Sequence, residues 1–319
     1  MIQSDLSNKI LWEPLQKNVN RLCIISAYAT PNMASWVIKN ISGRTSKAID
    51  ISLIVGMVAY DGISIAVHEG FVELQRASMP KEISKFSCSY ICELPAVHTN
   101  LFIWLEDDKP LIAFTGSAHF TQPSFSKNRR EVMVECNPDE AYKYYCKVIG
   151  DSIYCNHGEI EDNVTLYPTH PILDKENNPV ECLSGSDIGS VTLSLLSRSG
   201  ETGAKSGLNW GQRNKRNRNE AYISLPVAVA RTGFFPLNKQ HFTVVTDDHH
   251  QLIFRVEQEN DKAITTPLSN ALLGEYFRNR LGLANGEYVT KQHLLDYGRT
   301  DVTFYKLDEE QFYMDFSVS

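Results

Sequence analysis

The stretch that decides the fold is VHTNLFIWLEDDKPLIAFTGSAHFTQ, residues 97–122, followed by NRREVMVE at residues 128–135. It contains two apolar runs, Leu101–Leu105 and Leu111–Thr115, joined by a short polar segment that includes proline. This pattern is typical of a hairpin between two buried strands. The start of the first strand and the end of the second then lie at the same end of a sheet.

Polar side chains stand at both of these strand ends. His98 lies just before the first strand, and the turn Gly116-Ser117-Ala118-His119 follows the second. Glu131 opens a third apolar run, which ends at Val134. We therefore expect an imidazole, a Gly-Ser turn and a carboxylate to come together at one place.

The pattern resembles the site of phospholipase D-like nucleases, in which a His-x-Lys strand is followed by a Gly-Ser-x-Asn turn and then a Glu. The surrounding sequence is similar to type II restriction endonucleases of the NgoFVII and BfiI kind. The segments that carry this resemblance are RLCIISAYATP (21–31), LIVGM (53–57), DGI (61–63) and GSAHFTQ (116–122).

The resemblance implies a mechanism without a metal ion or cofactor. In that family one imidazole attacks phosphorus and a second protonates the leaving oxygen. Each chain supplies one motif, so a homodimer with the site at its interface is implied. By this match His98 is the nucleophile or the general acid, and Ser117 holds a phosphate oxygen or orients an imidazole. Glu131 orients His98, with Glu135 as the second choice.

Two positions depart from the family pattern. Asn100 stands where the family has lysine, and His119 stands where it has asparagine. The lysine neutralises charge in the transition state, and Asn100 carries no charge. A protonated His119 would supply the missing charge. Alternatively, the nuclease domain is inactive and serves only for dimerisation.

Composition is that of an ordinary globular chain, with 319 residues, 42% hydrophobic, 22% charged and a net charge of −7. Its length favours two domains. The absence of an apolar run of about 18 residues and of a basic-then-apolar start predicts a cytoplasmic protein without a membrane segment. Seven cysteines are spread along the chain. A zinc site built from Cys146, Cys155 and His157 is not favoured, because the spacing contains no paired-ligand pattern.

The first part of the chain alternates between strand and helix patterns, which predicts an α/β domain with a mixed sheet and flanking helices over residues 1–165. The segment 166–190 is rich in Asn, Pro, Asp, Gly and Ser and is predicted to be a linker. Residues 191–319 contain short apolar runs separated by polar turns, which predicts a β-rich domain. The expected elements are strands at 21–27, 49–56, 191–196, 221–223, 242–245, 252–256 and 302–305, and helices at 33–41, 61–77, 141–149, 269–281 and 291–297.

The second domain carries a basic segment, AKSGLNWGQRNKRNRNEAYI, residues 204–223. Five bases and no acids lie between Lys205 and Arg218, although the whole chain is acidic. Together with LDYGRTDVTFYK at 295–306, this segment resembles the B3-like DNA-recognition domain that follows the nuclease in the NgoFVII group, a pseudobarrel with two arms. The resemblance assigns one arm to residues 205–220. The DNA-contacting candidates within it are Lys205, Asn209, Trp210, Gln212, Arg213, Lys215, Arg216, Arg218, Asn219 and Glu220.

The second arm is assigned to Arg299 and Asp301, since an Arg next to an Asp can read a guanine and a neighbouring cytosine. A structural ion pair is the alternative for these two residues. Trp210 is expected to anchor the arm or the core.

The sequence thus predicts a homodimeric, type II-like restriction endonuclease that cleaves double-stranded DNA at specific sequences without a metal ion. A DNA-binding protein with an inactive phospholipase D-like domain is the alternative. A cognate DNA methyltransferase and an ATPase or helicase are possible partners. A lipid substrate is disfavoured by the basic arm and by the lack of an amphipathic surface helix.

Overall fold

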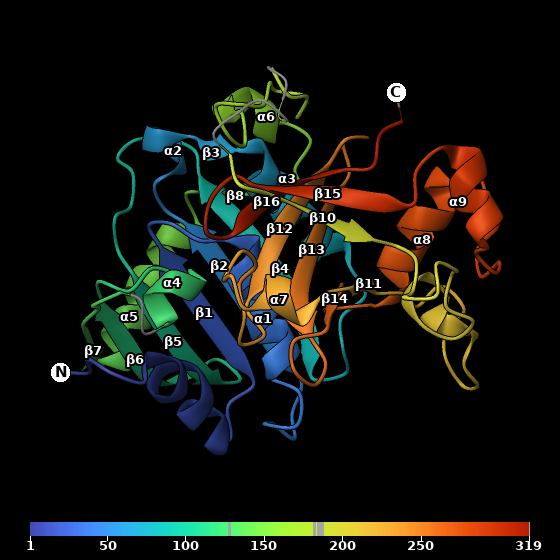
Figure 1. Ribbon diagram of the computed structural model, residues 1–319. Helices are drawn as coiled ribbons and strands as arrows, with labels where there is room; N and C mark the ends of the chain where they lie inside the picture. Colours follow the sequence, from blue (N-terminus) through green and yellow to red (C-terminus); the bar gives the residue numbers. More distant parts are fainter. Residues whose placement is uncertain (127–128, 181–182, 184–187, 319) are drawn as a thin grey trace. The chain divides into compact units, whose positions relative to one another are not determined.

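The computed structural model describes residues 1–126, 129–180, 183 and 188–318. The chain divides into two compact units, Met1–Tyr167 and Pro168–Ser319. In Figure 1 the first unit runs from blue to green and the second from yellow-green to red.

Unit 1 is built on a mixed sheet of seven strands in the order β7-β6-β5-β1-β2-β4-β8. The three central strands β1, β2 and β4 are parallel, and the outer neighbours pair antiparallel. A separate parallel pair is formed by β3 and β9. The strands are β1 Arg21–Ser26, β2 Ile49–Val55, β3 Ile63–Ser64, β4 Ile83–Ile91, β5 Leu101–Glu106, β6 Lys109–Gly116, β7 Met133–Cys136, β8 Ser152–Tyr154 and β9 Leu166–Tyr167.

Helices cover both faces of this sheet. On one face α5 packs over β1, β5 and β6, and the Tyr145 hydroxyl of α5 donates a hydrogen bond to Ser52 Oγ at 2.7 Å. On the other face α3 packs against β4, with α1 beside it. Trp104 Nε1 of β5 donates to Ile10 O of η1 at 2.8 Å. The helices are η1 Ser7–Trp12, η2 Glu13–Gln16, α1 Pro31–Asn40, α2 Val58–Asp61, α3 Ile65–Arg76, α4 Gln122–Phe125, α5 Pro138–Ile149 and α6 Ile160–Asn163.

The predicted hairpin is confirmed. Strands β5 and β6 pair antiparallel, with Leu101 opposite Thr115. Residues 98–100 and 116–119 therefore lie at the same end of the sheet. The third run forms β7, which begins at Met133 rather than at Glu131. Helix α1 is capped by Thr30, whose Oγ1 accepts from Met33 N.

Unit 2 is a sheet of seven strands in the order β10-β15-β16-β12-β13-β14-β11. The end strands β10 and β11 lie against each other, so the sheet is nearly closed into a barrel. All strand pairs are antiparallel except β12–β16. The strands are β10 Ser190–Ser194, β11 Ile223–Ser224, β12 His241–Thr246, β13 Gln251–Glu257, β14 Ala263–Thr265, β15 Asp301–Lys306 and β16 Gln311–Asp315.

The barrel encloses a core rich in phenylalanine, in which Phe235, Phe242 and Phe312 contact one another. Its helices are η4 Gly207–Gln212, α7 Val227–Ala230, α8 Ala271–Arg280 and α9 Lys291–Tyr297. The predicted fold class is therefore confirmed in both units, an α/β domain and a β-rich pseudobarrel. Part of the predicted linker, residues 181–182 and 184–187, lies outside the described residues.

Within the described residues, every helix is too short or too polar to cross a membrane.

Candidate active site and DNA-binding surface

The candidate active site lies at the end of the sheet where β1 and β2 finish and β5 begins. His98 is held there because the preceding residue, Val97, donates its N–H to Gly56 O at 2.9 Å. A Cβ added to Gly56 would lie 1.9 Å from Val97 O. Only glycine therefore allows this approach, which fixes the chain that carries His98. The His98 side chain is exposed.

Asn100 is buried at the centre of this end of the sheet, with 4% of its surface exposed. Its Oδ1 accepts from Ala27 N at 3.2 Å, and its Nδ2 donates to Gly116 O and Ser117 O at 3.2 Å each. Oδ1 also accepts from Ser26 Oγ at 3.1 Å and lies 2.9 Å from His119 Nδ1. The two residues that depart from the family pattern are thus in direct contact.

Three aromatic rings meet beside Asn100. The ring centroids of His98 and His119 are 6.1 Å apart, and Tyr28 lies edge-on to both, at 6.1 and 5.1 Å. The Tyr28 hydroxyl donates to Asp61 Oδ2 at 2.6 Å. The predicted convergence of His98 with the turn at 116–119 is therefore present in a single chain.

Ser117 and Glu131 form a second group at this end of the sheet. The Ser117 hydroxyl donates to Glu131 Oε2, and Ser124 Oγ donates to Glu131 Oε1 at 3.2 Å. Ser117 N donates to Val132 O at 2.9 Å and Val132 N donates to Ser117 Oγ at 3.0 Å, which holds the two segments together. The structure differs here from the prediction, since in the described part of the chain Glu131 is bonded to serine hydroxyls and not to His98. The turn before β7 aims the carboxylate at Ser117.

The charge state of His119 follows from its surroundings. Burial lowers the pKa of His119, and the positive charges of His98 and Arg129 act in the same direction, while Glu131 opposes them. His119 is therefore neutral near pH 7 in the free protein. This is the opposite of what a charge-supplying role for His119 requires.

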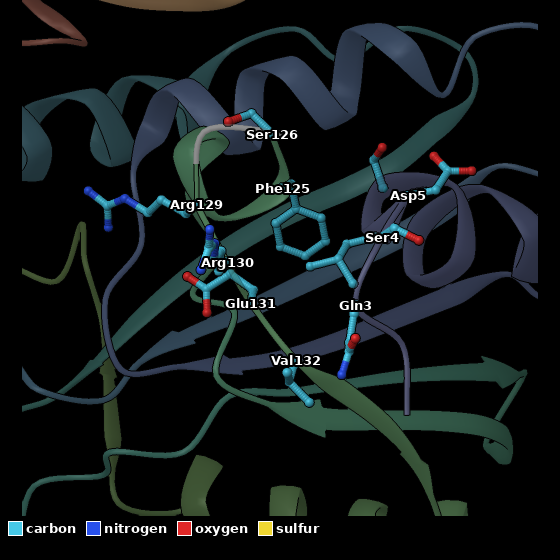
Figure 2. A pocket seen from close by; sticks show the side chains of 11 residues that line it. Gln3, Ser4, Asp5, Phe125, Ser126, Arg129, Arg130, Glu131 and Val132 are labelled. Atoms are coloured by element: carbon cyan, nitrogen blue, oxygen red, sulfur yellow. The ribbon is translucent and has the colours of Figure 1, made fainter.

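A cavity of about 890 Å³ adjoins the Glu131 side of the site. Figure 2 shows Phe125 between the N-terminal residues Gln3 to Asp5 and the segment Arg129 to Val132, with the Arg129 side chain extending away from Phe125. Two guanidinium groups thus lie next to the candidate site, and sequence reasoning gave them no role.

The basic segment of unit 2 is exposed from Arg213 to Arg218. Of its five bases, only Arg216 forms an ion pair with a carboxylate within the described residues, to Glu220. The Arg216 guanidinium also lies 4.0 Å from the centroid of the Trp210 ring. Trp210 in turn packs edge-on against Tyr222 at 5.6 Å, so it anchors the segment as expected.

Three polar residues of this segment hold it to residues 285–289. Asn209 is fully buried and exchanges two hydrogen bonds with the Val289 backbone, at 2.7 and 2.8 Å. Gln212 Nε2 donates to Gly286 O at 3.0 Å, and Asn219 Oδ1 accepts from Gly286 N at 2.6 Å. These amides hold the segment in place by hydrogen bonds, and its basic side chains remain exposed.

Arg299 and Asp301 form an ion pair inside unit 2. Arg299 Nε donates to Asp301 Oδ1 at 3.1 Å, and Nη1 donates to Asp315 Oδ2 at 2.8 Å. Its remaining donors reach Thr303 Oγ1 and Ser317 O. These bonds within unit 2 favour the structural ion pair over the reading of a base.

No group of three or more His, Cys, Asp or Glu side chains suited to hold a metal ion occurs among the described residues. Cys146, Cys155 and His157 accordingly do not form one.

Two family models match the chain. Residues 4–162 match the NgoFVII restriction endonuclease N-terminal PLD domain, and residues 183–308 match the NgoFVII C-terminal B3-like DNA-binding domain. The chain belongs to the NgoFVII restriction endonuclease family. This NgoFVII-family chain therefore joins a phospholipase D-like nuclease domain to a B3-like DNA-binding domain, and DNA is its partner.

Among solved structures, NucT from Helicobacter pylori is similar to the NgoFVII-family chain, with 17% identity and a TM-score of 0.33. The match covers 47% of this chain and 91% of NucT. A comparison with curated protein sequences finds no significant match.

Sequence reasoning missed Tyr28 and Ser124 and gave Arg129 no role. Tyr28 lies inside RLCIISAYATP, a segment that carries the family resemblance, so a signal for it was present. Ser124 and Arg129 follow the GSAHFTQ turn in a polar stretch without periodicity, where no sequence pattern marks a site.

Proposed function

We propose that this protein cleaves double-stranded DNA at specific sequences by imidazole chemistry that needs no metal ion. The observation that carries the proposal is the pair of imidazoles, His98 and His119, at one end of the sheet with Ser117 and Glu131 beside them. Attack on phosphorus needs a neutral imidazole, and departure of the leaving oxygen needs a protonated one. Two imidazoles at this separation are suited to flank one phosphodiester.

The other side chains fit supporting roles. The Ser117 hydroxyl lies between Glu131 and the backbone N–H of Val132, so its position is fixed for contact with a phosphate oxygen. Arg129, which is close enough to act on His119, is suited to supply the positive charge that Asn100 does not carry. In the unbound protein His119 itself is neutral.

The proposed active form is a homodimer in which the candidate sites of two protomers meet at a shared interface. His98 is exposed, as a residue at such an interface must be before assembly. Sedimentation of the purified protein is expected to give twice the 36.1 kDa of one chain. A monomeric species that cleaves DNA at full rate would remove the dimer from the proposal.

Sequence recognition is assigned to the basic segment of unit 2. Lys205, Arg213, Lys215 and Arg218 are exposed and form no ion pair with the described carboxylates, so they are free to contact phosphates and base edges. Gln212 and Asn219 hold the segment in shape, and Asn209 is buried beneath it. Arg299 and Asp301 are not kept as DNA contacts. A methyltransferase and an ATP-driven partner remain predictions.

The second candidate function is sequence-specific DNA binding with an inactive nuclease domain. It is favoured by the loss of the family's lysine at Asn100. It is disfavoured by the contact between Asn100 and His119, because two independent losses would not be expected to produce a hydrogen bond at the centre of the site.

Plasmid cleavage in excess EDTA decides between the two functions. The wild-type chain is expected to cut, and His98→Ala is expected to bind the same DNA without cutting. His157→Ala is the matched control, because His157 is exposed and lies outside the site. If the wild-type chain binds DNA tightly but never cuts it, the nuclease proposal is wrong.

A further inference from the structure

We infer that His119 is the nucleophile of this site and that Asn100 is the positioning residue that fixes its tautomer. The inference rests on the proposed nuclease function. It assigns distinct tasks to the two imidazoles, His119 for bond formation and His98 for proton transfer.

The orientation of the Asn100 amide is set by its neighbours. The two ends of an amide side chain are distinguished by their partners. Ala27 N can only donate, so the atom facing it is the oxygen. Gly116 O and Ser117 O can only accept, so the atom facing them is the nitrogen. Three backbone groups thus fix Asn100 in one orientation.

The orientation of Asn100 then decides the tautomer of His119. His119 Nδ1 lies 2.9 Å from Asn100 Oδ1, which has no proton to give. Nδ1 must therefore carry the proton, and in a neutral imidazole Nε2 then carries a lone pair. Since burial lowers the pKa of His119, this neutral form is the one present near pH 7. A neutral imidazole with a free Nε2 is what a nucleophile requires.

The packing around His119 holds the ring in place. Tyr28 lies edge-on to it at 5.1 Å, and the Tyr28 hydroxyl is bonded to Asp61, which keeps that hydroxyl from competing for Nε2. Asn100 is itself buried, so solvent does not loosen the contact. His98 is exposed at 6.1 Å, where it can exchange protons with water.

The chemical steps follow from this arrangement. His119 Nε2 forms a bond to phosphorus while the bond from phosphorus to the leaving oxygen breaks, and protonated His98 gives its proton to that oxygen. The phosphorylated ring keeps its Nδ1 proton, which Asn100 Oδ1 accepts. In the second step neutral His98 takes a proton from water, the water oxygen bonds to phosphorus, and the phosphorus–nitrogen bond breaks. Its electron pair returns to Nε2.

The roles of His98 and His119 can be distinguished with a substrate whose leaving group needs no proton. We would compare His98→Asn and His119→Asn on DNA and on a thymidine phosphodiester whose leaving group is p-nitrophenolate. Loss of a general acid is expected to slow DNA cleavage by about 10²–10⁴-fold. With the activated ester, His98→Asn is expected to keep the first burst of nitrophenolate, and His119→Asn is expected to lose it.

Any other pattern with the two variants overturns the assignment. In particular, a burst that survives in His119→Asn and is lost in His98→Asn would make His98 the nucleophile, while the nuclease function would stand. Failure of the wild-type chain to cut DNA in EDTA would instead contradict the proposed function. Retained DNA binding and thermal melting confirm that each variant is folded.

A second measurement is independent of catalysis. The nitrogen chemical shifts of the His119 ring, assigned by their loss in His119→Asn, are expected to show a protonated Nδ1 and an unprotonated Nε2 in the wild-type chain. Asn100→Ala is expected to remove this preference and to slow cleavage by about 10-fold or more, because an imidazole in the wrong tautomer cannot attack. A protonated Nε2 in the wild-type chain would overturn the inference.

Thr115→Val is the matched control for Asn100→Ala. Thr115 Oγ1 donates to the backbone carbonyl of Asn100 at 2.9 Å and not to its side chain. The variant therefore removes a neighbouring hydrogen bond and leaves the amide orientation intact. The nitrogen shifts of His119 are expected to be unchanged in Thr115→Val, and a change equal to that in Asn100→Ala would count against the role of the amide.

Discussion

At the scale of single residues, the active site depends on the charges that surround His119. Burial, His98 and Arg129 lower its pKa, and Glu131 raises it, while Tyr28 packs against the ring and is bonded to Asp61. A lowered pKa keeps the imidazole neutral to a lower pH. The acidic limb of the pH profile for kcat/KM is therefore expected below the ordinary histidine value of about 6.5.

Glu131→Gln tests the effect of Glu131 on the pKa of His119. Loss of the carboxylate removes the influence that raises the pKa of His119, so the acidic limb is expected to move to still lower pH. The overall rate is also expected to fall, because Ser117 loses its charged partner. The measurement is kcat/KM for DNA cleavage between pH 4.5 and 8.

Glu135→Gln is the matched control for the pH profile. Glu135 lies in β7 opposite Phe114, and it is not among the groups that shift His119. Its acidic limb is expected to coincide with that of the wild-type chain. An acidic limb in Glu131→Gln that moves upward would contradict the assignment of this limb to His119.

Arg299 forms hydrogen bonds with several side chains of unit 2, so its removal is expected to lower stability. Its guanidinium donates to Asp301, Asp315 and Thr303, so Arg299→Ala leaves two partly buried carboxylates without their partner. The free energy of unfolding is expected to fall by about 1–3 kcal/mol. Urea denaturation measures this loss. Arg198→Ala, at an exposed position, is expected to change little.

DNA affinity provides the discriminating readout for Arg299. If it is a structural residue, folded Arg299→Ala binds DNA with the salt dependence of the wild-type chain. A smaller dependence of DNA affinity on salt, together with unchanged stability, would instead indicate that Arg299 contacts DNA as part of the second arm.

At the scale of elements, the approach of β7 to β6 sets the position of Glu131. A Cβ added to Gly116 would lie 2.1 Å from Val132 O, so Gly116→Ala must separate the two strands. We expect this variant to lose DNA cleavage, because Ser117 and Glu131 move apart, and to keep the DNA binding of unit 2. Cleavage and binding assays on the same preparation measure the two effects.

Gly158→Ala is the control for Gly116→Ala. An added Cβ at Gly158 meets no atom within 4 Å. Cleavage is expected to be unchanged in this variant. If Gly116→Ala also cleaves normally, the spacing between β6 and β7 does not determine the activity.

The sequence predicted those elements whose burial appears as an unbroken apolar run. Strands β1, β2, β5 and β6 are of this kind, because both faces of the sheet are covered and nearly every residue is apolar. Strand β4 was missed, since ISKFSCSYI places serines at buried positions. The three-residue strand β14 and strand β16, QFYMD, were also missed, because they are too short or too polar to stand out from turns.

The same limit applies to the candidate site. The meeting of His98 with the turn at 116–119 followed from antiparallel pairing, which a sequence can reveal. The partner of Glu131 and the bond between Asn100 and His119 did not, because both depend on how loops orient side chains. The engagement of Arg299 by Asp315 joins residues of different strands and is likewise invisible in a local pattern.

At the scale of the whole molecule, each unit has an apolar core among its described residues. The buried members of the aromatic core of the barrel lie between Leu193 and Phe316, and those of the core under α5 lie between Cys23 and Val148. We expect the fragment 168–319 to bind the same DNA sequence as the whole chain, as measured by selection of bound oligonucleotides.

Salt dependence tests the basic segment within that fragment. Lys215→Ala is expected to weaken binding to all sequences and to reduce the slope of log K against log salt by about 1. Lys239→Ala is the control, because it removes the same charge from an exposed position outside the segment. Equal slopes in both variants would show that the segment does not contact the DNA backbone.

The bond between Asn100 and His119 also bears on how this chain diverged from its ancestors. A lysine restored at position 100 would have to displace the His119 ring, because Asn100 Oδ1 lies 2.9 Å from His119 Nδ1. We therefore expect Asn100→Lys alone to be more damaging than Asn100→Lys combined with His119→Asn, so that the two substitutions are coupled. Among descendants of the same lineage, these two positions should be inherited as one unit.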